Sequence, residues 1–166
     1  MLNKKILIEL QEYVESHLNT IKVLEDIRYT LKEEIFDLHS LEIEDFIKNK
    51  RKPTLSEVLF NFIDQKNTSD PVIYKKAGID RKHFSKIRSN PSYRPKKNTI
   101  IALALALELN QDETEELLSS AGYSLSDSDT SDLVIQFCLE KKIYDIDLVN
   151  EALDYFSLKP LVGLLK

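Results

Sequence analysis

The residues best suited to chemistry in this chain are lysines and arginines gathered in its middle. Residues 51–99 carry 12 basic and 4 acidic side chains, whereas residues 1–50 carry 7 and 11, and residues 100–166 carry 4 and 13. Between positions 75 and 97, nine basic residues accompany a single acidic one. A basic middle between acidic flanks focuses positive potential on one part of the surface. The chemistry that this predicts is the binding of anionic groups, even though the net charge of the chain is −5.

Two short helices are expected to position these cations. The first begins near Asp70-Pro71, because proline in a first helical turn loses no hydrogen bond. It stops at Gly78, where a residue without a Cβ can turn left-handed. Asp80 then caps a second helix over residues 81–88, which holds several of the basic side chains.

The spacing of apolar residues predicts that these two helices cross steeply. Ile73 and Ala77 face inward from the first helix, and Ile79 fills the gap after the turn. Phe84 and Ile87 anchor the buried side of the second helix. Two helices locked at a steep angle around a sharp turn need such a set of buried positions.

This pattern resembles the helix-turn-helix of the lambda-repressor/Cro superfamily, also called the XRE family. A helix at 55–65 precedes the pair, a loop with prolines at 89–97 follows it, and helices at 99–109 and 112–121 complete a five-helix order over residues 54–122. Tyr74 departs from the family pattern, which usually has a small residue there because two backbones approach closely. That departure affects the expected angle at which the helix pair docks on its ligand more than it affects the expected fold.

The resemblance implies a DNA-binding regulator whose second helix enters the major groove of duplex DNA. Carried over by position, the implied base contacts are Arg81, Lys82, Ser85 and Lys86, of which arginine and lysine pair with guanine acceptors. The implied contacts to the DNA backbone are Lys75, Lys76, Arg88, Asn90, Tyr93, Arg94, Lys96 and Lys97.

A second interpretation keeps the same fold as a protein-interaction module, since fold does not determine function. The acidic flanks and the long N-terminal extension are not needed for DNA binding. They favour an adaptor or inhibitor, of the kind that phages and mobile elements encode, which binds a host protein by imitating nucleic acid. The basic cluster is also compatible with a solvated face, or with one that docks on the chain's own carboxylates.

The first fifty residues contain no glycine or proline and repeat apolar side chains every seven positions. With Leu7 at position a, the apolar a and d residues are Leu7, Leu10, Val14, Ile21, Leu24, Leu31, Ile35 and Leu38. Arg28 and His17 interrupt this seam. It predicts either a coiled-coil arm that makes a homodimer, or a helix or antiparallel helix pair packed on the chain's own core. Ser40 is expected to cap a separate helix over residues 41–49.

The whole chain is therefore expected to be all-α, with an N-terminal extension at 1–52, a central domain at 54–122 and a C-terminal segment at 123–166 packed on the core. Asn98 is expected to cap the helix at 99–109. The C-terminal segment is expected to hold helices near 132–141 and 146–156 and an apolar tail at 158–164.

Signals for an enzyme, a metal site or a cofactor are missing from the sequence. His17, His39 and His83 are scattered, Cys138 is the single cysteine, and three isolated glycines cannot make a phosphate loop. There is no apolar run of the length that spans a bilayer, and the N-terminal residues lack a signal-peptide apolar region. The lone cysteine and these features predict a cytoplasmic protein without a membrane segment.

Overall fold

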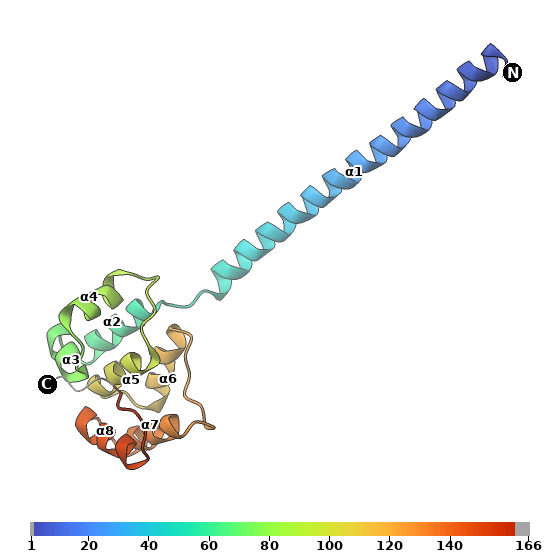
Figure 1. The fold of residues 1–166 in the computed structure, drawn as a ribbon. Coiled ribbons are helices and arrows are strands. Elements are labelled where there is room, and N and C mark those ends of the chain that lie inside the picture. The colour runs from blue at the N-terminus through green and yellow to red at the C-terminus, as the bar shows by residue number, and fades with distance from the viewer. Residues whose placement is uncertain (1, 162–166) are drawn as a thin grey trace. The chain divides into compact units, whose positions relative to one another are not determined.

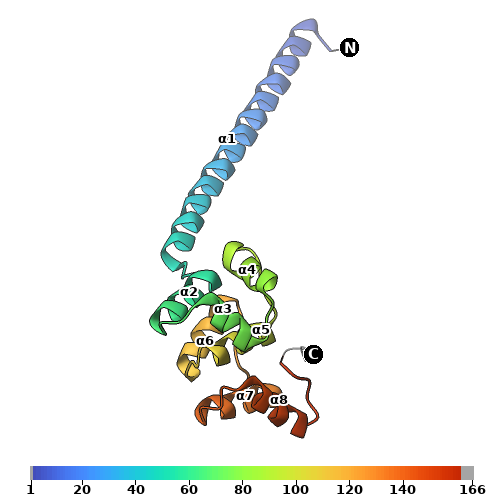
Figure 2. The same cartoon turned by 90° about the vertical axis from the view of Figure 1, so that its left-hand side faces the viewer.

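Residues 2–161 are described by a computed structural model, and every regular element in them is a helix (Figures 1 and 2). In chain order the helices are α1 (Lys4–Lys50), α2 (Leu55–Gln65), α3 (Asp70–Ala77), α4 (Arg81–Ser89), α5 (Lys97–Ala106), α6 (Gln111–Ser120), α7 (Thr130–Glu140) and α8 (Ile146–Tyr155). The prediction of an all-α chain is confirmed. The chain divides into two compact units, Met1–Arg51 and Lys52–Lys166.

The first unit consists of one uninterrupted helix of 47 residues, α1. Asn3 caps it by accepting a hydrogen bond from the Lys5 amide at 3.2 Å. The helix ends just before Pro53, since a residue that precedes proline is pushed out of the helical region. The prediction that Ser40 starts a separate helix is wrong. Nothing around Ser40 breaks the helical hydrogen bonds, because no glycine or proline lies within α1.

No side chain of α1 is buried. An antiparallel helix pair within the first fifty residues is excluded by the continuity of α1, and that interpretation is wrong. Two interpretations of the seam are compatible with one continuous helix: a coiled-coil arm, and a single helix packed on the chain's own core.

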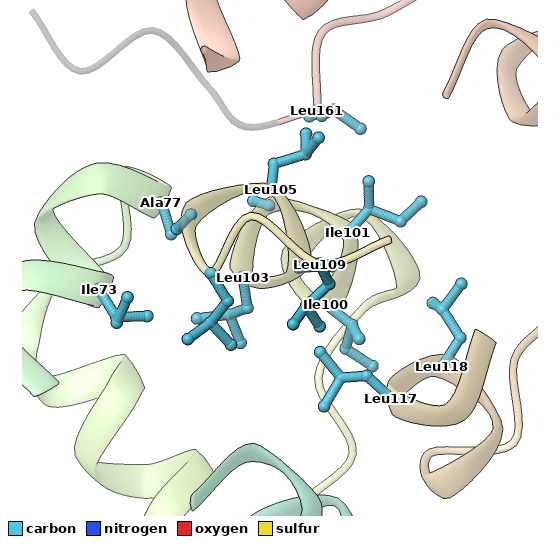
Figure 3. Packing of buried hydrophobic residues seen from close by; sticks show 14 of the residues in the cluster. Ile73, Ala77, Ile100, Ile101, Leu103, Leu105, Leu109, Leu117, Leu118 and Leu161 are labelled. Atoms are coloured by element: carbon cyan, nitrogen blue, oxygen red, sulfur yellow. The ribbon is translucent and has the colours of Figure 1, made fainter. Parts of the chain in front are cut away.

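The second unit is organised around α5, which packs against α3, α6 and α8. Every residue of α5 from Thr99 to Ala106 is buried. Figure 3 shows side chains of α3 and α6 surrounding those of α5, with Ile73 and Ala77 on one side and Leu117 and Leu118 on another. An Ala- and Leu-rich helix that is apolar all round is the kind that a core encloses.

The boundaries of α5 differ from the prediction of a helix at 99–109 capped by Asn98. The helix starts at Lys97, and the cap residue, Lys96, makes no side-chain hydrogen bond to it. Its end comes earlier than expected because Glu108 adopts a left-handed φ of 55°. This turn lets the Leu109 amide donate back to the Ala104 carbonyl at 3.1 Å and buries Leu109.

The helices α7 and α8 pack on each other and belong to the same unit as α2–α6. Asp129 and Asp145 cap them through hydrogen bonds from amides in their first turns. Leu161 is buried in the core, and its amide donates to Asn150 Oδ1 at 2.9 Å. Residues 162–164 of the predicted apolar tail lie outside the described residues.

A partly buried ion pair holds α7 against α5. Lys97 Nζ lies 2.6 Å from Asp132 Oδ2, which also accepts from the Ser126 amide at 2.8 Å, and Asp132 is 6% exposed.

We expect Asp132→Ala to lower the free energy of unfolding by about 2–3 kcal/mol, because the Lys97 ammonium and the Ser126 amide would both lose their hydrogen-bond partner. Urea unfolding followed by circular dichroism measures this loss. Asp127→Ala, at an exposed neighbouring position, is the control and is expected to cost about 0.5 kcal/mol or less. Equal losses in the two variants would show that the pair does not stabilise the unit.

Candidate functional site

The pair of helices α3 and α4 is held by local backbone geometry and by buried side chains. Gly78 ends α3 with a left-handed φ of 69°, and the Ile79 amide donates to the Tyr74 carbonyl at 2.9 Å. Asp80 begins α4 by accepting from the His83 amide at 2.6 Å. The side chains predicted to lock the pair are all buried, namely Ile73, Ala77, Ile79, Phe84 and Ile87. The predicted turn, cap and inward-facing residues are therefore confirmed.

Tyr74 of α3 packs against α4. Its side chain is half-buried, and its ring centroid lies 5.6 Å from that of Phe84 with the planes tilted by 49°. A tilted aromatic contact of this kind is favourable. Tyr74 therefore packs against the buried anchor of α4.

The outer side of α4 carries the predicted base-contact residues, Arg81, Lys82, Ser85 and Lys86, and all of them are exposed. Residues four apart on a helix lie above one another, so Arg81 neighbours Ser85 and Lys82 neighbours Lys86. Phe84 and Ile87 occupy the buried side of the same helix. We call these four exposed residues the α4 face.

Lys86 is held in place by the loop that follows α4. Its Nζ atom lies 4.4 Å from the ring centroid of Tyr93, and His83 Nε2 lies 3.0 Å from the Tyr93 hydroxyl oxygen. A cation over an aromatic face is attracted by the negative potential of the ring. Tyr93, predicted as a backbone contact, thus uses both its ring and its hydroxyl to organise the α4 face.

Three of the other predicted backbone contacts have partners inside the protein. Arg88 pairs with Asp70 and stacks on Phe60, with its guanidinium carbon 4.3 Å from the ring centroid. Arg94 stacks on Tyr123 at 4.4 Å and donates to the Gly122 carbonyl at 3.1 Å.

Lys97 is the third, and it forms the partly buried ion pair with Asp132. Arg88, Arg94 and Lys97 therefore hold helices and loops together, and a carboxylate neutralises the charges of Arg88 and Lys97. The residues that they contact lie far away in the sequence, so short-range sequence patterns do not predict these contacts.

The rest of the predicted backbone set lies at the ends of α3 and in the loop before α5. Lys75, Lys76 and Lys96 are exposed cations. The Asn90 side chain accepts from the Ser92 amide at 3.0 Å, and so it stabilises the turn that carries Tyr93. Two of these exposed lysines thus lie in the last turn of α3 and one directly before α5.

A shallow groove of about 460 Å³ separates the outer sides of α3 and α4. It is lined by Asp70, Pro71, Tyr74, Arg81, Phe84, Ser85 and Arg88. Sequence reasoning did not find this groove, because it is formed by the packing of α3 against α4. The Arg81 and Ser85 side chains line both the groove and the α4 face.

In residues 2–161, the remaining candidates for chemistry are Cys138 and the side chains that can ligate a metal ion. Burial raises the pKa of the Cys138 thiol by desolvation, which keeps it protonated and unreactive at neutral pH. Within the described residues, histidine, cysteine and carboxylate side chains do not form a group of three able to hold a metal ion. No helix in the same residues combines the length and apolar character needed to cross a membrane.

Known proteins provide no relative on which to base an assignment. Neither protein-family models, nor curated proteins, nor solved structures match this chain. The functional assignment therefore depends on the geometry and charge of the α4 face.

Proposed function

We propose that residues 54–122 form a lambda-repressor-like helix-turn-helix domain that binds duplex DNA through α4. The observation that carries this proposal is the α4 face itself, where Arg81, Lys82, Ser85 and Lys86 are exposed together on a helix whose other side is buried. The order of α2 to α6, with the turn at Gly78, supports the same fold family.

In this proposal α4 enters the major groove, where the first residues of a recognition helix contact base edges. Arg81 and Lys82 lie in the first turn of α4 and are suited to the O6 and N7 acceptors of guanine. Lys86 is one turn further along and is already oriented by Tyr93. A lysine that is ordered before binding loses less side-chain entropy on contact with DNA.

The lysines around α4 complete the interface in this proposal. Lys75, Lys76 and Lys96 neutralise phosphates and set the register of the protein on the duplex. Exposed carboxylates on α6, α7 and α8 repel phosphates, and so they favour an approach with the α4 face forward. Such a domain acts as a DNA-binding regulator.

A titration of dye-labelled random duplex DNA tests this function. At about 50 mM salt we expect a saturable rise in fluorescence anisotropy at micromolar protein, because nonspecific binding of such domains lies in the micromolar range or weaker. The proposed interface contains six exposed cations, namely Lys75, Lys76, Arg81, Lys82, Lys86 and Lys96. The slope of log K against log salt is therefore expected to be about −3 to −5. An unchanged anisotropy at low salt would contradict the proposal.

A protein-interaction role is the second candidate, and the charge of the C-terminal helices favours it. Residues 100–166 carry 13 acidic and 4 basic side chains, and Asp147, Glu151 and Asp154 of α8 are exposed. Carboxylates in such density imitate a phosphate backbone and fit the nucleic-acid channel of a host protein. A partner that is recovered after nuclease treatment, and lost when these three α8 residues are changed to lysine, would support this role over DNA binding.

A further inference from the structure

The seam of α1 is an apolar surface whose side chains have no partner within the first unit. Its eight apolar a and d side chains are between 46% and 61% exposed. At 1.5 Å per residue, the 47 residues of α1 extend over about 70 Å. A stripe of this length on a helix with no buried residue marks an interaction surface.

We propose that a second copy of this chain covers the seam, and that the two α1 helices form a parallel two-stranded coiled coil. The residue types at the two seam positions select this arrangement. Apart from Leu7, the apolar a positions are β-branched, namely Val14, Ile21 and Ile35. The apolar d positions are all leucine, namely Leu10, Leu24, Leu31 and Leu38. β-branched residues at a with leucine at d favour two parallel strands over three or four.

The residues beside the seam suit the same arrangement. In a parallel coil each g residue faces the e residue that follows five positions later on the partner helix. This places Tyr13 against Leu18 of the second copy and Leu41 against its Phe46, which widens the apolar interface at both ends. Glu34 faces His39, and no pair of like charges occurs at these positions from Ile6 to Phe46.

Arg28 and His17 set the register of the coil. Each lies at a core position and meets its own counterpart only when the helices are parallel and in register. A single polar residue at a core position lowers stability but specifies alignment. The long arginine side chain reaches water at the edge of the coil while its methylene groups stay on the seam.

In a parallel dimer, Lys52–Lys166 of both copies follow the same end of the coiled coil. The dimer itself does not depend on DNA binding, but together with the proposed function it predicts two half-sites related by two-fold symmetry. The self-association is measured without DNA, so its failure and the failure of DNA binding are distinguishable.

Sedimentation equilibrium of the full chain tests the dimer. We expect a mass twice the 19.2 kDa of one chain at micromolar concentration. Ile21→Glu with Leu24→Glu is expected to weaken association by at least about 100-fold, since two carboxylates per helix would enter the apolar seam. Ile8→Glu with Val23→Glu is the matched control, with similarly exposed residues on the same helix but outside the seam. This control is expected to remain dimeric. A monomeric wild-type chain, or a dimeric seam variant, would overturn the proposal.

Cysteine cross-linking tests the orientation. In a parallel coil Leu10→Cys places two thiols at facing d positions, so mild oxidation is expected to give a covalent dimer that reductant separates. The unsubstituted chain, whose only cysteine is the buried Cys138, is expected to give none. A Leu10→Cys protein that sediments as a dimer but does not cross-link would refute the parallel arrangement.

Discussion

Arg81→Glu, Lys82→Glu and Lys86→Glu together are expected to weaken duplex-DNA binding by at least about 100-fold. A good pairing between a side chain and a base edge contributes about 1–3 kcal/mol, and each reversal also adds repulsion from phosphate. The three residues are exposed and sit opposite the buried anchors Phe84 and Ile87, so the fold should tolerate the changes. Fluorescence anisotropy with a labelled duplex at fixed salt measures the loss.

The control for this experiment carries the same change in net charge elsewhere. Lys5, Lys141 and Lys159 are exposed and lie outside α4 and its neighbouring loop. Their replacement by glutamate is expected to weaken binding by only a few fold, through the general field of the protein. Equal losses in the two triple variants would mean that net charge governs the binding, and the α4 face would then have no special role.

Phe84→Ala is expected to lower the free energy of unfolding of the second unit by about 3–5 kcal/mol. Phe84 is 3% exposed and packs against Tyr74, so its removal leaves a cavity between α3 and α4. Urea unfolding followed by far-ultraviolet circular dichroism measures this change. A destabilised contact between the two helices should also weaken DNA binding, because the angle of α4 depends on it.

Phe60→Ala serves as the comparison for Phe84→Ala. Phe60 is 37% exposed, and its ring contacts the guanidinium of Arg88. The expected loss is about 1 kcal/mol or less, as for a cation–π contact near the surface. If the two variants lost the same stability, Phe84 would not be the anchor that holds α4.

Local signals explain which elements were predictable from the sequence. Thr54 and Asp80 accept hydrogen bonds from amides three residues later, and Gly78 turns left-handed, so the starts of α2 and α4 and the end of α3 depend on single residues. The start of α5 has no such signal, because burial of its Ile, Leu and Ala side chains determines where it lies. Serine at position 40 resembles a cap, but it lies in a segment where no glycine or proline interrupts the helix.

The candidate site also contains features that the sequence predicts and features that it does not. The α4 face was predictable because helical periodicity alone separates Arg81, Lys82 and Lys86 from Phe84 and Ile87. The partners of Arg94 and Lys97 were not predictable, because they lie 28 and 35 residues away and are brought close only by the packing of α5, α6 and α7. Tertiary contacts thus decided which cations remain free.

A photo-cross-linking experiment tests most directly that the α4 face contacts DNA. A benzophenone side chain would replace Ser85 on α4 in one protein and Ser128, an exposed serine in the loop before α7, in another. Irradiation with labelled duplex DNA is expected to give a covalent adduct from position 85 and little from position 128. An adduct from position 128 alone, or from neither position while anisotropy still reports binding, would contradict the assignment of α4 as the DNA-contacting helix.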